Sequence, residues 1–252
     1  MTPTPFARRA GRLGGRNTIV RGVSFLVTVL CLAAAGPAQV FAETEPSEAS
    51  CGTQVAQGML ADLADWPFGA REELIESEAA RSRSIAYLRE VAADDVPVPK
   101  LWRPHLDDAR EESLIVRLTI VNDLVNRVPY RRVAEWLHPE IFLSNGGDCD
   151  CAAVTKYMLL RKLDVPAADM RVTLAYWPRR QAQHAFLVVR GKDPKLGLSL
   201  LDINHKRVVA ALYCTKYVPL LSVNEEGVWR HAETSKRITD HFLNPRIVRP
   251  KK

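Results

Sequence analysis

Apolar residues recur every three or four positions through the first half of the chain. Three segments have this spacing, Val55 to Trp66, Ala70 to Ala93 and Glu111 to Val128, and each is predicted to form a helix. Between the last two segments, Asp94 to Asp107 contains three prolines and is expected to be an irregular crossing segment without a helix. Pro129 closes the third helix, so helices are expected to form the first part of the fold.

A glycine-containing loop then leads into a further helix. After a short helical piece predicted at Val133 to Leu137, Gly146 and Gly147 permit backbone angles that a side chain would forbid. Asp148 is expected to cap the helix that follows, because an aspartate oxygen accepts hydrogen bonds from the first free N–H groups. Cys149 is therefore predicted to lie at a helix N-terminus.

Beyond this helix the apolar period changes from near 3.6 to 2, which is typical of strands. The predicted strands are Arg171 to Trp177, His184 to Arg190, Gly197 to Ile203 and about Val208 to Tyr217. Helices followed by an antiparallel meander predict an α+β fold, with the Cys149 helix packed on the sheet.

The position of Cys149 favours use of its sulfur as a nucleophile. Free N–H groups and the positive end of the helix dipole stabilise a thiolate and so lower the pKa of a thiol. Asp148 and Asp150 flank the sulfur and oppose this effect, so a nearby imidazolium or a bound cation is needed. His184 is the candidate imidazolium.

Thiol acyl transfer needs a nucleophile, a base within hydrogen-bond reach and a group that orients the base. Of six histidines, only His184 begins an apolar strand directly after the Cys149 helix. Asp202 is the acid of the strand expected to pair beside it. A histidine at a strand edge is more often an ordinary surface or half-buried residue, yet the order Cys149, His184, Asp202 favours a catalytic triad.

Two amides on the predicted helix at 111–128, Asn122 and Asn126, allow two interpretations. In one they are ordinary exposed or locally bonded side chains. In the other, one of them bonds the loop that carries Cys149.

The first 42 residues have the pattern of a secretory signal peptide. Arg8 to Arg21 is basic and free of acids, Val23 to Ala35 is apolar, and Val40 to Ala42 resembles a cleavage site. We expect cleavage after Ala42 and a periplasmic location, with no transmembrane span in the mature protein. An uncleaved N-terminal anchor is the alternative.

The excess of basic residues belongs mostly to this signal. Residues 1–42 hold five Lys and Arg and no acids, so the remainder has 30 basic and 29 acidic side chains. No concentrated basic stripe indicates a nucleic-acid partner. The 210 residues at 43–252 are enough for one domain with a core of its own.

Four cysteines follow the predicted cleavage site. With Cys149 free for catalysis, we expect one disulfide, Cys51–Cys214, with Cys51–Cys151 as the alternative. A third arrangement uses all four cysteines in two disulfides. Cys151 has two further interpretations, a buried small hydrophobe or a thiol that resolves oxidised Cys149.

Several motifs together resemble the bacterial transglutaminase-like cysteine proteinases. These motifs are Val121 to Asn126, Tyr130, Trp136, Gly147 to Tyr157, Gln183-His184-Ala185 and Leu201-Asp202. The resemblance spans about Leu114 to Val209. It implies a papain-like core with Cys149 as nucleophile, His184 as base and Asp202 as the residue that orients the base.

The resemblance also implies a biological setting. Members of this family cleave large surface adhesins in the periplasm and so release cells from biofilms, and an inner-membrane receptor can sequester them. They bind calcium through the acids flanking the nucleophile, which here are Asp148 and Asp150.

The chain departs from the family pattern Asp-Cys-Glu-Asp-Tyr, because it has Asp150, Cys151 and Ala152 after the nucleophile. We therefore expect a periplasmic cysteine endopeptidase that acts on an adhesin-type protein. Amine transfer by a transglutaminase and a catalytically silent binding module of the same fold are the alternatives.

Overall fold

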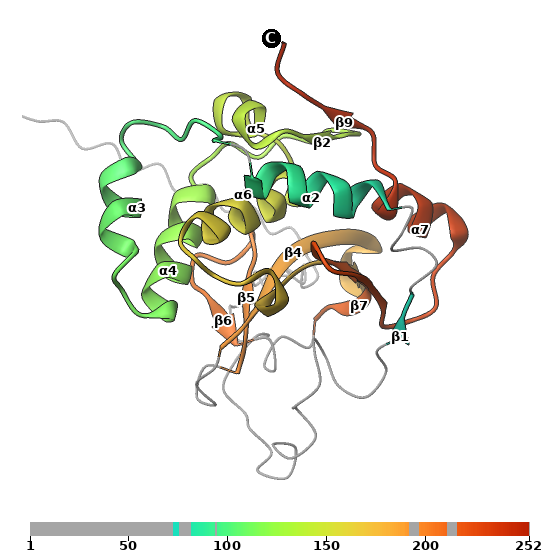
Figure 1. The fold of residues 1–252 in the computed structure, drawn as a ribbon. Coiled ribbons are helices and arrows are strands. Elements are labelled where there is room, and N and C mark those ends of the chain that lie inside the picture. The colour runs from blue at the N-terminus through green and yellow to red at the C-terminus, as the bar shows by residue number, and fades with distance from the viewer. Residues whose placement is uncertain (1–72, 76–81, 94, 192–196, 211–215, 252) are drawn as a thin grey trace, which may run out of the picture. The chain divides into compact units, whose positions relative to one another are not determined.

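One antiparallel sheet and a layer of helices make up the described part of a computed structural model of the chain (Figure 1). The structure describes residues 73–75, 82–93, 95–191, 197–210 and 216–251. The predicted signal peptide and the predicted helix at Val55 to Trp66 lie outside these residues. Cleavage after Ala42 therefore stays a prediction. None of the described helices combines the length and apolar character needed to cross a membrane.

The sheet has seven strands in the order β1-β8-β7-β3-β4-β5-β6, and all neighbouring strands are antiparallel. Its strands are β1 (Glu73–Leu74), β3 (Met170–Trp177), β4 (Ala182–Arg190), β5 (Leu198–Leu201), β6 (Val209–Ala210), β7 (Val218–Val223) and β8 (Val228–Arg230). β3 to β6 form the predicted meander, and β7 adds to the other side of β3. The predicted α+β fold is confirmed.

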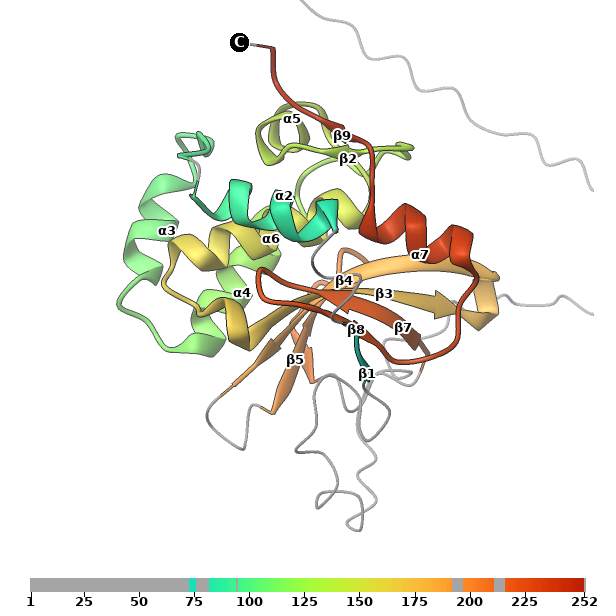
Figure 2. The same cartoon turned by 45° about the vertical axis from the view of Figure 1, so that its right-hand side comes forward.

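The helices gather on one face of the sheet (Figures 1 and 2). They are α2 (Arg83–Ala93), α3 (Arg103–Ala109), α4 (Leu114–Val125), α5 (Pro139–Asn145), α6 (Cys149–Lys162) and α7 (Lys236–Leu243), with short 3₁₀ turns η2 (Ala167–Asp169) and η3 (Pro178–Arg180). A second, parallel sheet pairs β2 (Trp136–Leu137) with β9 (Ile247–Val248).

α6 is the central helix of this layer. Every residue from Cys151 to Leu160 is buried, because α6 packs against β4, α2, α4 and α5 together. A helix covered on all sides needs no polar stripe, which explains why α6 has little amphipathic pattern. The helix that begins with Cys149 is therefore held rigidly by the core.

The predictions for two neighbouring segments were wrong in part. Of the segment Ala70 to Ala93, only α2 is helical in the described residues, while Glu73 and Leu74 pair with β8 instead. The segment Asp94 to Asp107 was expected to be irregular, yet it contains the start of α3. Pro104 is tolerated there because the first turn of a helix leaves its N–H groups unpaired in any case.

The prediction of a helical piece at Val133 to Leu137 was wrong. Trp136 and Leu137 form a strand because the distant segment β9 pairs with them, with the Trp136 N–H donating to the Arg246 carbonyl at 2.9 Å. Pro139 then opens α5, a helix that the apolar pattern did not predict.

The loop before Cys149 is fixed by backbone contacts with the segment that follows α4. Tyr130 bridges Gly147 in parallel, and the Arg131 N–H donates to the Gly147 carbonyl at 2.8 Å. Gly146 has φ 77° and ψ 176°, a conformation essentially restricted to glycine. A Cβ atom at Gly146 would lie 2.3 Å from the Pro129 carbonyl oxygen.

We therefore expect Gly146→Ala to lower the free energy of unfolding by on the order of 1–3 kcal/mol or more, since backbone strain and a backbone clash add. The measurement is chemical denaturation monitored by tryptophan fluorescence. Gly227→Ala is the matched control, because its Cβ would meet only side-chain atoms of Leu74 and Trp229 at 3.1 Å. Equal losses for the two variants would contradict this account of Gly146.

Candidate active site

Cys149 is the first residue of α6, as predicted from the sequence, and its side chain is half-buried. Its thiol donates to Asp150 Oδ1 at 3.3 Å. Burial and then the Asp150 carboxylate raise the pKa of Cys149 well above its usual value, whereas the Ala185 backbone N–H lowers it. The helix N-terminus alone therefore does not ionise this thiol.

Asp148 occupies the predicted N-cap position, but its side chain makes no capping hydrogen bond. Its Oδ1 atom is buried without a hydrogen-bond partner among the described residues. Burial and then the negative charge of Asp150 raise the pKa of Asp148 to about 7. The prediction of a capping side chain was wrong, and the carboxylate is instead in an unfavourable environment.

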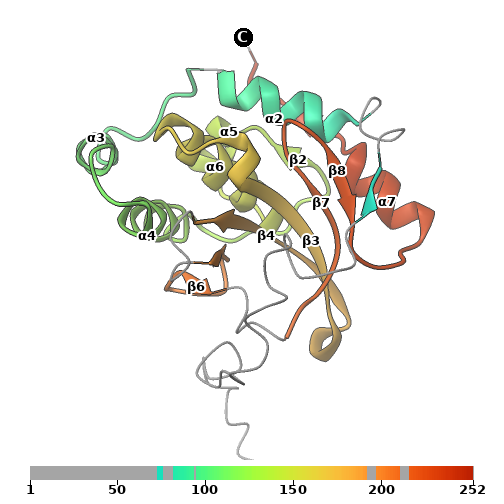
Figure 3. The ribbon, with the colours of Figure 1, turned by 60° about the horizontal axis from the view of Figure 1, so that its bottom comes forward.

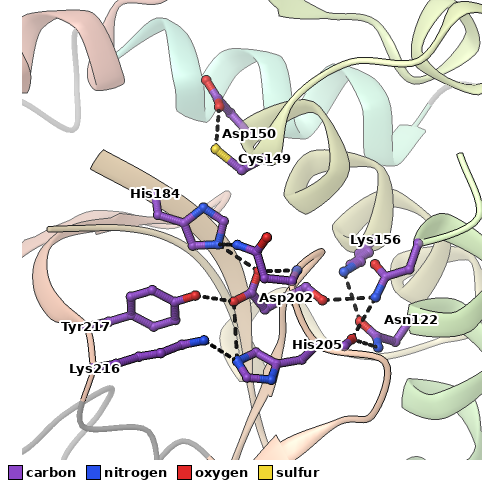
Figure 4. Close-up of polar contacts among 11 residues, drawn as sticks. Asn122, Cys149, Asp150, Lys156, His184, Asp202, His205, Lys216 and Tyr217 are labelled. Atoms are coloured by element: carbon purple, nitrogen blue, oxygen red, sulfur yellow. Dashed lines mark hydrogen bonds and ion pairs between the residues drawn. The ribbon is translucent and has the colours of Figure 1, made fainter. Parts of the chain in front are cut away.

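His184 and Asp202 meet between β4 and the loop that follows β5. His184 Nε2 lies 2.7 Å from Asp202 Oδ1, and both side chains are buried (Figure 4). The Asn204 N–H donates to the same oxygen at 2.9 Å, and the Tyr217 hydroxyl donates to Oδ2 at 2.5 Å. Burial opposes ionisation, but His184 and these hydrogen bonds hold the pKa of Asp202 well below its usual range.

This arrangement assigns different tasks to the two nitrogens of the imidazole. A proton on Nε2 is held by Asp202, so Nδ1 is left as the basic nitrogen. Asn204 Nδ2 lies 3.1 Å from the same Nε2 atom. Cys149 and His184 make no hydrogen bond with each other among the contacts of the described residues, because Sγ is turned to Asp150 (Figure 4).

Asn122 of α4 and Asn126, which caps the C-terminus of α4, hold the loop that carries Asp202, rather than the loop that carries Cys149. Asn126 Nδ2 donates to the Asp202 carbonyl at 3.0 Å, and both amides donate to the His205 carbonyl. α4 lies beside β6 in Figure 3, which places the amides next to this loop. Both interpretations made from the sequence were wrong, since Asn122 is fully buried and its partner is 83 residues away.

Lysines reach this network from two sides. Lys156 of α6 is buried and donates to Asn122 Oδ1 at 2.9 Å, and burial lowers the pKa of Lys156 to about 7. Lys216 Nζ lies 2.7 Å from His205 Nε2, which in turn lies 3.8 Å from Asp202 Oδ2. The positive groups therefore compensate the buried charge of Asp202.

Four residues of this network were not predicted from the sequence, namely Asn204, Tyr217, Lys156 and Lys216. A lysine within an otherwise apolar helix was the one local signal available for Lys156. The other three are polar residues near strand ends, and nothing in their spacing points to Asp202.

Cys151 is a buried free thiol, which agrees with its interpretation as a small hydrophobe. Its Sγ accepts a hydrogen bond from the Leu137 N–H at 3.4 Å, and burial raises its pKa. The alternative disulfide Cys51–Cys151 is not formed. The preferred pairing of Cys51 with Cys214 lies outside the described residues.

The acids beside Cys149 form a pair, not a larger cluster. Within residues 73–251 as far as they are described, no three His, Cys, Asp or Glu side chains come together to hold a metal ion. The unpartnered oxygen of Asp148 and its raised pKa nonetheless fit a cation, because a positive charge would offset both costs.

The sequence matches no family model and no curated protein. Among solved structures the chain is similar to LapG of Legionella pneumophila, with 23% identity and a TM-score of 0.49, over 61% of this chain and 91% of LapG. EGTA-treated and calcium-bound forms of LapG give the same TM-score, with 23% and 22% identity over 60% of this chain and 87% and 92% of theirs. A fold likeness of this degree does not assign an activity, so the chemistry has to come from this chain's own residues.

Replacement of Asp150 by Asn should lower the pKa of Cys149, because the negative charge that opposes the thiolate is lost. The midpoint of the pH profile for iodoacetamide alkylation of Cys149 then moves to lower pH, and alkylation at pH 7.5 becomes faster. The measurement is mass spectrometry of the Cys149 peptide with chelator present.

Asp164→Asn is the matched control, since Asp164 is an exposed acid that pairs with Arg110 beyond the far end of α6. Its alkylation profile should equal that of wild type. An unchanged or upward-shifted midpoint in Asp150→Asn would show that Asp150 does not control the thiol.

Proposed function

We propose that this protein is a cysteine endopeptidase in which Cys149, His184 and Asp202 act as a triad. The observation that carries the proposal is the buried contact of 2.7 Å between His184 Nε2 and Asp202 Oδ1. His184 lies on β4, and the backbone of the next residue on that strand, Ala185, contacts Cys149. Three neighbours hydrogen-bond the ionised Asp202 carboxylate, and one of them is the imidazole that it would orient. The family resemblance of the motifs around these residues supports the same assignment.

The mechanism begins when Cys149 turns from Asp150 toward His184 and transfers its proton to Nδ1. The thiolate attacks a peptide carbonyl, and free N–H groups at the start of α6 stabilise the oxyanion. His184 then protonates the leaving amine and afterwards activates water to release the acyl group. Asp202 keeps Nε2 protonated and stabilises the imidazolium throughout.

The proposed substrate is a secreted or surface protein of the adhesin type, cleaved in the periplasm. The signal-peptide pattern of residues 1–42 supports the location, and the family resemblance supports the substrate class, an effect on biofilm attachment and an inner-membrane receptor as partner. The nearly balanced charge of residues 43–252 supports a protein partner over nucleic acid.

Cys149→Ala should abolish cleavage while leaving the fold intact. Comparison of surface proteins from cells with the variant and with wild type should show one full-length protein that accumulates only in the variant. The control is the Cys151→Ser variant, in which the neighbouring thiol is changed. This variant should cleave the same surface protein as wild type does. Identical surface proteins in both strains would contradict the proposal, and amine incorporation without new termini would indicate a transglutaminase.

We also propose that Asp148 and Asp150 hold a calcium ion. Two carboxylates supply part of the six to eight oxygens that calcium prefers, so main-chain or water oxygens would complete the site. The ion would lower the electrostatic cost of a thiolate between two acids.

Calcium should therefore raise the melting temperature of the purified protein relative to excess chelator, and magnesium should do so less. Asp148→Asn should abolish the calcium-dependent shift, because it removes a charged ligand. Asp169→Asn, which changes an acid paired with Arg190 away from the site, should retain the shift. A melting temperature independent of calcium in wild type would rule out the ion.

A further inference from the structure

A pocket of about 660 Å³ opens between the β3–β4 hairpin, the start of β7 and the N-terminal end of α7. Figure 2 shows α7 lying over this end of the sheet. Its walls combine the apolar side chains of Tyr176, Val218, Leu220, Ala232 and Ile238 with polar residues, of which Glu233 alone is charged. Tyr176 and Val218 are also among the large apolar side chains that remain exposed, at 38% and 42%.

The pocket adjoins the proposed catalytic residues along two strands. Gln183 lines the pocket and directly precedes His184 on β4. Val218 also lines it and directly follows Tyr217, whose hydroxyl donates to Asp202. Since two residues of a strand span about 6.6 Å, the pocket begins within one side chain's length of the point where Ala185 meets Cys149.

A polar atom in the pocket wall has no partner. Thr234 Oγ1 is buried, and no described residue lies within hydrogen-bond distance of it. A buried hydroxyl without a partner costs free energy, and that cost is recovered when a ligand supplies the missing hydrogen bond. A peptide backbone, which has both donors and acceptors, is a suitable ligand for such an atom.

We propose that this pocket is a substrate subsite, which binds an apolar side chain of the polypeptide near the bond that Cys149 attacks. The apolar part of the wall selects Leu-, Ile- or Phe-like side chains, Glu233 disfavours an acidic one, and Thr234 Oγ1 bonds the peptide backbone beside them. The pocket therefore sets substrate preference. This proposal deepens the proposed peptidase function and rests on it.

The test is binding of fluorescent Ala/Gly dodecapeptides, each with a single central Leu, Phe, Asp or Lys, to the full chain carrying Cys149→Ala. Fluorescence polarisation measures affinity without turnover. We expect the Leu and Phe peptides to bind at least about tenfold more tightly than the Asp peptide, which is the usual scale for filling an apolar pocket. The Lys peptide should bind with intermediate affinity, because Glu233 lines the pocket.

Two added substitutions probe the pocket itself. Val218→Lys places a cation in a partly exposed wall and should remove the Leu preference while improving binding of the Asp peptide. Ala232→Phe fills the pocket and should weaken binding of the Leu and Phe peptides without weakening that of the Asp and Lys peptides. The control substitution is Leu101→Lys, which changes an 84% exposed leucine away from the pocket. The variant with this substitution should bind all four peptides with the same affinities as the Cys149→Ala protein.

Equal affinity for all four peptides would overturn the subsite. So would an unchanged Leu preference in either pocket variant, provided that its melting temperature equals that of Cys149→Ala. Incubation of the same peptides with wild-type protein tests hydrolysis in a separate assay. Apolar preference without any cleavage would retain the pocket as a binding site and refute the peptidase function, so the two failures are distinguishable.

Discussion

The buried negative charge of Asp202 is the constraint on which the rest of the site depends. A carboxylate with no exposed surface is costly unless hydrogen bonds and positive groups replace water. Here His184, Tyr217 and Asn204 contact its two oxygens, while α4 holds its main chain. Four separate segments must therefore be placed correctly before this one side chain is stable, and the orientation of the imidazole follows from them.

The second constraint is the central position of α6. This helix carries Cys149 at one end and the buried amine of Lys156 in its middle, so the candidate nucleophile and the support of the Asp202 loop belong to one rigid element. A shift of α6 would move both at once. The geometry between thiol and imidazole is thus determined by helix packing in the core and not by the flexibility of surface loops.

Local patterns were sufficient to predict the α+β class, β3, β4 and the start of α6. They also selected Cys149, His184 and Asp202, which remain candidates for catalysis. Partners distant in sequence explain what was missed. Trp136 and Leu137 look helical until residues 247 and 248 pair with them, and Asn126 looks like a surface amide until residue 205 accepts its hydrogen bond. No period in a single segment records such pairings.

The parallel pairing of β2 with β9 has a consequence for the rigidity of the loop before Cys149. β2 lies directly before α5 and this loop, and the Leu137 N–H donates to Cys151, the first buried residue of α6. β9 follows every described strand of the large sheet along the chain, yet no described strand of that sheet pairs with it. Separation of β9 from β2 would therefore loosen the Cys149 loop while leaving the hydrogen bonds of the large sheet intact.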